Sequence, residues 1–107
     1  MKNVLYFSYT DDLNDRFSGV SKKIKSQVNA IENLGYNVYL SGFFDGLYMV
    51  EDEIDSLDLK NINKINKKKV LFDFIFNKIK TLGINILYIR MFGATSSLIS
   101  FLLLVIF

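Results

Sequence analysis

The residues best able to do chemistry follow the first and last predicted strands. A polar loop, Tyr9–Ser18, comes directly after the apolar run Val4–Phe7 and opens into a predicted helix that begins near Gly19. In open α/β sheets, ligands bind in the crevice at the carboxyl ends of the strands. Two interpretations of Ser18 and Gly19 are therefore open. The backbone N–H groups that glycine leaves accessible at a helix start bind an anion, or Ser18-Gly19 only caps the helix.

Four further polar residues are candidates for binding. Arg90 follows the predicted strand Ile84–Ile89, where its guanidinium either contacts a phosphate or carboxylate or faces solvent. The aspartates of the loop are either ligands of substrate hydroxyl groups or loop residues that bond their own backbone. We favour the second interpretation for all three of them, Asp11, Asp12 and Asp15.

Composition limits the classes of protein and of chemistry. The 107 residues are 50% hydrophobic and 22% charged, enough for the core of a single domain spanning 1–107. Cysteine and histidine are absent, so disulfides, thiolate metal sites and histidine bases are excluded. No metal or cofactor is expected. A net charge of +2 predicts no nucleic-acid partner, and the start lacks a secretory signal, so we expect a cytoplasmic location.

The first half of the chain has clear helix and strand signals. The apolar spacing predicts a helix over about 19–34, capped by Ser18 and closed by Gly35. Its core stripe is Val20, Ile24, Val28, Ile31 and Leu34. We expect a second strand over 38–41 that ends at Gly42. Asp45-Gly46 is interpreted as a turn, and the residues after it predict an inserted hairpin, 47–50 against roughly 54–59.

The second half contains one more helix and one more strand before an apolar end. The lysine- and asparagine-rich stretch 60–69 binds phosphates or a membrane surface, or it is a solvated loop with the first turn of a helix, which we favour. The helix is expected over about 67–82, closed by Gly83. Its broad apolar face comprises Leu71, Phe72, Ile75, Phe76, Ile79 and Leu82. The strand Ile84–Ile89 follows it.

The C-terminal stretch has two interpretations. Met91–Phe107 is uncharged over 17 residues, the lower limit for a spanning helix. Serines, threonine and glycine dilute its first half, and no basic residue follows it. Residues 97–107 are therefore expected to be a helix buried against a sheet whose remaining strands are missing. A C-terminal membrane anchor is the alternative.

Four stretches carry a resemblance to a known family. They are Val4–Tyr9, Ser18–Ile24, Gln27–Leu40 and Leu87–Arg90. The chain resembles the N-terminal domain of GT-B glycosyltransferases, and among these it is most similar to the family 4 retaining enzymes. In that family G-G-V/x-x-x-x-I opens the first helix, and A-L-x-x-x-G-H-x-V leads to the second strand. Ala30–Val38 fits the second pattern with Tyr36 in the histidine position, and Ser18 replaces the first glycine.

The resemblance implies an α/β, Rossmann-like fold, a partial GT-B N-terminal domain with a parallel sheet, flanking helices and an inserted β-hairpin. It implies that Ser18 and Gly19 lie at an interdomain cleft, and Arg90 is the further candidate for acceptor binding. The chain would be the acceptor-side portion of an enzyme that transfers sugar from a nucleotide-sugar donor to a glycan or lipid-linked acceptor, in cell-surface polysaccharide or glycoconjugate synthesis. Without a donor-binding domain it is expected to be inactive alone, and no catalytic residue is assigned.

Two functions from other classes stay open. The first is a small receiver-like binding module, in which Asp11-Asp12 after the first strand would hold Mg²⁺. The second is a membrane-anchored interaction protein that uses residues 91–107. Peripheral association with the inner face of the membrane is compatible with the glycosyltransferase interpretation as well.

A sheet that lacks its later strands exposes an edge and apolar helix faces. We therefore predict that the 107-residue chain self-associates or is poorly soluble. Size-exclusion chromatography with light scattering over a range of concentrations measures this. A monodisperse monomer at high concentration would contradict the prediction.

Overall fold

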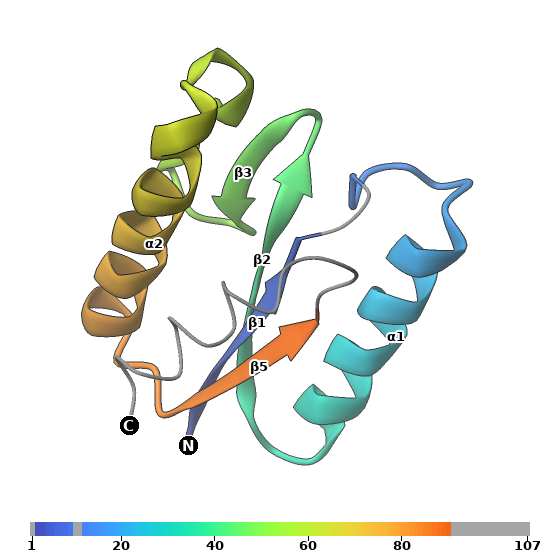
Figure 1. The fold of residues 1–107 in the computed structure, drawn as a ribbon. Helices are drawn as coiled ribbons and strands as arrows, with labels where there is room; N and C mark the ends of the chain where they lie inside the picture. The colour runs from blue at the N-terminus through green and yellow to red at the C-terminus, as the bar shows by residue number, and fades with distance from the viewer. Residues whose placement is uncertain (1, 10–11, 91–107) are drawn as a thin grey trace.

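In the computed structural model, residues 2–9 and 12–90 are described, and within them two α-helices pack on one sheet (Figure 1). The elements, in chain order, are β1 (Asn3–Ser8), α1 (Gly19–Asn33), β2 (Asn37–Phe44), β3 (Leu47–Val50), β4 (Ser56–Leu57), the 3₁₀ turn η1 (Leu59–Asn61), α2 (Lys64–Thr81) and β5 (Ile86–Arg90). The expected C-terminal helix, and with it the choice between a buried helix and an anchor, lies outside the described residues.

The sheet of the described residues has five strands in the order β4-β3-β2-β1-β5. β1 pairs in parallel with β2 and with β5, whereas β2 with β3 and β3 with β4 are antiparallel. The predicted α/β class is confirmed. The sheet is mixed rather than parallel, because the hairpin predicted as an insertion pairs with β2 and extends the same sheet.

The two helices cover opposite faces of the sheet (Figure 1). Connections between parallel strands are right-handed, so crossovers that place β2 and β5 on opposite sides of β1 carry their helices to opposite faces. Tyr6 in β1 packs with Ile24 of α1, whereas Leu5 and Phe7 pack with Ile75 of α2. β1 is thus buried on both faces, as its continuous apolar run predicts.

Helix α1 agrees closely with the predicted range. Ser18 is its N-cap, and the Ser18 side chain accepts a hydrogen bond from the N–H of Ser21 at 3.2 Å. Gly35 has a φ of 97° and follows the C-cap, so the predicted glycine ending is confirmed. The stripe packs on the sheet except for Leu34, which is 76% exposed because it is the C-cap, where the chain has begun to turn away.

The connection from β2 to β3 is tighter than predicted. β2 continues through Gly42 to Phe44, so the predicted end of the second strand at Gly42 is wrong. Asp45 and Gly46 form the turn with φ values of 53° and 86°, the left-handed pair of a two-residue type I′ hairpin. The predicted pairing of 47–50 with 54–59 exists, but it is limited to Ser56–Leu57.

Helix α2 starts at Lys64, three residues before its predicted start at 67, and ends at Thr81 with Gly83 at a φ of 60°. Its predicted apolar face packs against β1, β3 and β5, with Leu71, Phe72 and Ile75 buried. β5 is found at Ile86–Arg90, so the predicted strand exists but begins and ends slightly later.

A lysine is buried on this face of α2, which the sequence did not predict. The Lys78 side chain is 4% exposed, and its Nζ lies 3.3 Å from Glu53 Oε1 and 3.1 Å from Asp55 Oδ2. It also lies 5.6 Å from the centre of the Phe74 ring, within reach of a cation–π interaction. A buried ammonium is tolerated only when it is paired, so Lys78 fastens the acidic loop after β3 to α2.

Buried hydrogen bonds join β1, β2 and β3 near their ends. The Ser8 hydroxyl donates to the Ser41 carbonyl oxygen at 2.6 Å, and the Tyr48 hydroxyl donates to the Ser8 carbonyl oxygen at 2.9 Å. Above them Leu13, fully buried, lies against Gly42, and its N–H donates to the Phe43 carbonyl oxygen at 2.7 Å. The loop after β1 is therefore fixed on β2.

Gly42 has no room for a side chain. An ideal Cβ there would lie 2.5 Å from Ser8 Oγ and 2.7 Å from Leu13 Cδ1. We expect Gly42→Ala to lower the free energy of unfolding by about 1–3 kcal/mol, the usual cost of overpacking. Urea denaturation followed by circular dichroism measures the change.

The matched control is Gly19→Ala, since no atom lies within 4 Å of the Cβ position at Gly19. This change should leave the free energy of unfolding unaltered or raise it by up to about 1 kcal/mol, because alanine is the better helix former. Equal stabilities of the two variants would mean that Leu13 does not pack on Gly42 in solution.

Candidate functional site

The candidate site lies at the carboxyl ends of β1 and β5. β1 has β2 on one side and β5 on the other, and the crossover helices leave on opposite faces, so the strand order reverses beside β1. In open α/β sheets this is the place where ligands bind. Ser8 and Arg90 are register partners at this edge. The predicted site residue Arg90 therefore lies where the topology favours binding.

Arg90 is half-buried and held against α1 rather than pointing freely into solvent. Its Nη1 donates to Gln27 Oε1 at 3.2 Å, and the Tyr6 hydroxyl donates to the same oxygen. The Tyr6 ring stacks on Tyr88 with centroids 4.7 Å apart. Burial raises the pKa of Tyr6, and the positive charge of Arg90 opposes that rise only in part. The phenol therefore stays protonated and keeps donating to Gln27.

This arrangement fixes the plane of the guanidinium. An arginine carries five N–H donors in a rigid fork that matches phosphate and carboxylate oxygens. Because Gln27 binds one end of the fork, α1 helps to set the orientation of Arg90. Such a group can bind an anion without first losing much side-chain freedom.

Ser18 and Gly19 are found at the start of α1, where the first turn leaves backbone N–H groups without helical partners. Ser18 acts as the cap predicted for it, and Ser21 beside it donates from its hydroxyl to the Leu13 carbonyl oxygen at 2.9 Å. Gly19 is exposed. The capping interpretation of Ser18 is thus confirmed, and a role for Ser18 and Gly19 in ligand binding stays a prediction.

The three predicted site residues do not form one contiguous set of contacts. Arg90 contacts α1 at Gln27, eight residues after Gly19 and so about 12 Å further along the helix axis. They share α1 as their support, with Ser18 and Gly19 at its start and Arg90 on its flank facing β5. A ligand that reached both would need to span roughly two turns of the helix.

The acidic residues of the loop have structural contacts. Asp12 accepts hydrogen bonds from the N–H groups of Asn14 at 2.9 Å and Gly46 at 2.8 Å, and Asp15 accepts from the N–H of Phe17 at 3.0 Å. This agrees with their interpretation as loop formers, and Asp11 lies outside the described residues. Within the described part of the chain no group of three or more acidic, histidine or cysteine side chains could hold a metal ion.

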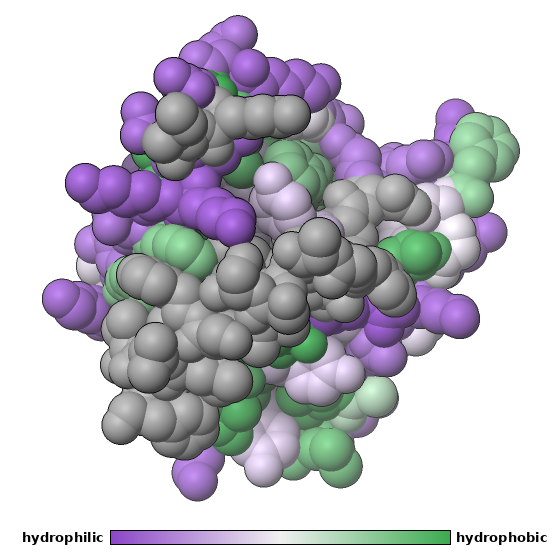
Figure 2. All heavy atoms as spheres, in the orientation of Figure 1, coloured by the Kyte–Doolittle hydropathy of each residue, from purple (hydrophilic) through white to green (hydrophobic). Residues whose placement is uncertain are grey.

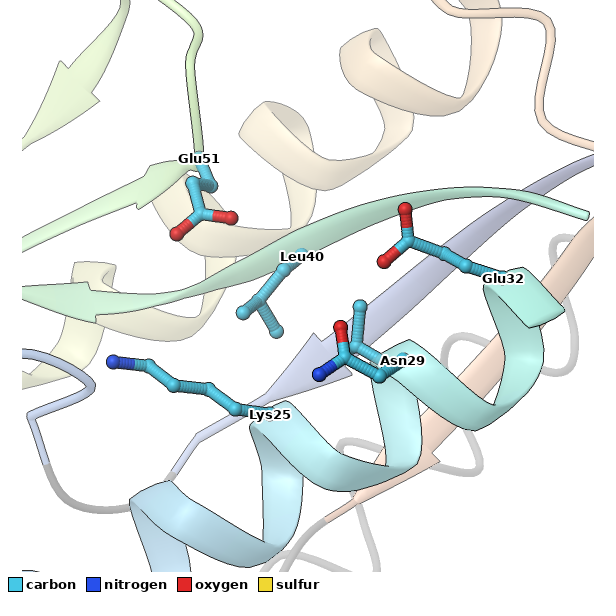
Figure 3. A pocket seen from close by; sticks show the side chains of 6 residues that line it. Lys25, Asn29, Glu32, Leu40 and Glu51 are labelled. Carbon is cyan, nitrogen blue, oxygen red and sulfur yellow. The ribbon is translucent and has the colours of Figure 1, made fainter.

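A groove of about 330 Å³ lies on the other flank of α1, facing β2 and the end of β3 (Figure 3). Leu40 and Val28 are its apolar lining residues, and the side chains of Lys25 and Glu51 face it from opposite sides. Asn29 and Glu32 complete the lining. The groove is open and carries both signs of charge, and it is separated from Arg90 by the width of the helix.

Two contributors to the Arg90 arrangement were not predicted. Tyr6 belongs to the buried strand β1, and Gln27 belongs to the flank of a surface helix, so neither has a local pattern that marks it. The only usable signal was that Gln27 is an uncharged polar residue next to Val28 of the apolar stripe, after the lysines of α1. Their meeting with Arg90 joins residues more than sixty positions apart.

Among the helices of residues 12–90, none is long and apolar enough to cross a membrane. Comparison with protein-family models, with curated proteins and with solved structures finds no significant match. The class of protein that can be stated from the fold is therefore an α/β domain with a mixed sheet, and any function is argued from its site.

Asp12 generates a prediction about pH. Burial by itself would raise its pKa, but hydrogen bonds from the N–H groups of Asn14, Gly46 and Asp45, with the charge of Lys60, hold the pKa of Asp12 below its ordinary value. Stability from a carboxylate with a lowered pKa is present above the unfolded value of about 3.9 and is lost as pH falls through the folded value. We expect Asp12→Asn to lower the unfolding free energy by about 1 kcal/mol at pH 7.

Urea denaturation at several pH values checks this. The difference between the wild type and Asp12→Asn should shrink as pH falls below about 4. Asp73→Asn, which removes an exposed carboxylate of α2, should change the unfolding free energy by less than about 0.5 kcal/mol at pH 7. A difference for Asp12→Asn that does not depend on pH would contradict the role of its charge.

Proposed function

We propose that this chain is the acceptor-side, N-terminal portion of a glycosyltransferase of the GT-B type, built on a Rossmann-like core. The observation that carries the proposal is Arg90, held by Gln27 at the carboxyl end of β5, beside the strand where the order of the sheet reverses. The parallel unit β2-β1-β5 with helices on opposite faces supports it. The antiparallel β3 and β4 are an addition at the far edge of this unit.

Each candidate residue has a defined part in this proposal. Arg90 binds the phosphate or carboxylate of a glycan or lipid-linked acceptor, and Gln27 with Tyr6 positions its guanidinium. Ser18 and Gly19 offer N–H groups at the start of α1 to an anionic group of the donor or acceptor. Transfer from a nucleotide sugar needs a second domain across the cleft, so the chain alone binds acceptors weakly and transfers nothing.

Amide chemical shifts of the isotopically labelled chain test the proposal. We expect glucose 1-phosphate and glucuronic acid, as anionic sugar probes, to shift two separate groups of signals, one around Arg90 and one around Ser18 and Gly19, because neither probe spans the distance between them. The affinity should be weak, in the millimolar range typical of small fragments. Arg90→Gln should weaken the binding at Arg90 about tenfold, the effect of losing one charge-assisted contact of roughly 1.4 kcal/mol. UDP-glucose and GDP-mannose should bind no better than the probes.

The control variant is Lys80→Gln, which removes one positive charge from an exposed position near the end of α2. It should leave the affinity for both probes unchanged. Micromolar affinity for either nucleotide sugar would count against an acceptor-side role. Probe-induced shifts that avoid the carboxyl ends of β1 and β5 would also count against it.

A further inference from the structure

The stretch Lys60–Lys69, called the basic segment from here on, is strongly charged. It carries five of the 13 lysines and arginines of the chain and no acidic residue. Because the chain as a whole has a net charge of only +2, the residues outside the segment are net negative. The positive charge of the chain is therefore concentrated in the basic segment, and the rest of the chain has a net negative charge.

The structure places the basic segment at one end of the molecule. It covers most of η1 and the first turns of α2. Lys60, Lys68 and Lys69 are exposed and Lys67 is half-buried. Figure 2 shows hydrophilic side chains gathered over this end, which is the upper left of the view. Lys60, Lys68 and Lys69 thus present their charge outward rather than into the fold.

The helix gives these charges an unfavourable position. The N-terminus of an α-helix carries a partial positive charge, so lysines there destabilise it, and acidic residues are the favourable choice. α2 has no acidic residue in its first turn. Within the described part of the chain Lys67 and Lys69 form no ion pair, in contrast to Lys78 with its two carboxylates. The charges of Lys67 and Lys69 are therefore available to an external anionic surface.

We propose that the basic segment docks the protein on a membrane surface rich in anionic phospholipids. All five of its cations are lysines, which act as hydrated point charges and suit a diffuse layer of headgroups, whereas arginine forks favour individual phosphates and nucleic acid. The nearby aromatic rings of Phe72, Phe74 and Phe76 pack in the core or against each other. They are not available for stacking on bases, so a nucleic-acid surface is the weaker fit.

The docked orientation follows from the fold. α2 precedes β5 and runs in the opposite direction, so its start lies at the end of the molecule to which β1 and β5 point (Figure 1). Docking through the basic segment would bring the carboxyl ends of these strands toward the lipid. The docking itself does not depend on the proposed sugar transfer, and it is measured without any sugar ligand.

The test is flotation of the full 107-residue chain with phosphatidylcholine vesicles, with and without phosphatidylglycerol. We expect binding only to the vesicles that contain phosphatidylglycerol, and its loss at about 1 M salt, where the Debye length is about 3 Å. Each lysine near an anionic surface contributes about fivefold to partitioning, so the triple variant Lys67→Gln, Lys68→Gln, Lys69→Gln should bind on the order of 100-fold more weakly.

The control removes two exposed lysines from the opposite end of the molecule, Lys2→Gln before β1 and Lys80→Gln at the end of α2. It is compared with Lys67→Gln, Lys69→Gln, which has the same net charge and should bind about 25-fold more weakly than the wild type. The control should bind within about threefold of the wild type, since charges beyond a Debye length of the surface are screened. Equal losses in the two double variants would overturn the proposal, as would equal binding to neutral vesicles. Binding to duplex DNA or homopolymer RNA without binding to anionic vesicles would also overturn it.

Discussion

Buried hydrogen bonds at the end of β1 hold the three neighbouring strands of the sheet in register. Ser8 bonds to Ser41 in β2, and Tyr48 in β3 bonds back to Ser8, so one small group joins three strands. Each of these polar atoms would lose its partner if one strand moved, at a cost of about 1–3 kcal/mol for a buried group. Leu13 can cover the group only because Gly42 has no side chain. Leu13 in turn bonds to Phe43 and accepts a hydrogen bond from Ser21, so it ties β2 to the first turn of α1.

The position of α1 then determines which side chains lie at the carboxyl ends of the strands. One flank of the helix faces β5, where Gln27 meets Tyr6 and Arg90, and the other flank forms the wall of the polar groove. The arginine is thereby held by a helix. A preoriented guanidinium loses less freedom when it binds an anion than one on a mobile loop. The proposed acceptor site depends on this small loss of side-chain freedom when the anion binds.

The lysines of α2 lie in two different environments. Lys78, near the end of the helix, is buried between the carboxylates of Glu53 and Asp55, and it holds the loop after β3 in place. Its position also suits the negative end of the helix dipole. The basic segment lies at the opposite end, where the dipole disfavours it and exposed lysines face solvent. One helix therefore carries a buried ion-paired lysine near its end and exposed lysines at its start. In the proposed docking, the exposed lysines are the ones that bind the membrane surface.

The local features of the fold could be predicted from the amino-acid sequence. The apolar spacing of α1 and α2, the cap at Ser18, the left-handed glycines Gly35 and Gly83 and the Asp45-Gly46 turn follow from interactions within a few residues. A local signal also produced the wrong end of the second strand, because a glycine after an apolar run is typical of a strand end. In the structure Gly42 lies within β2 and leaves room for Leu13. Tertiary structure alone decided the mixed sheet, the burial of Lys78 and the contact of Arg90 with Gln27. These depend on pairings between distant residues, whose free energies appear only once packing has brought them together.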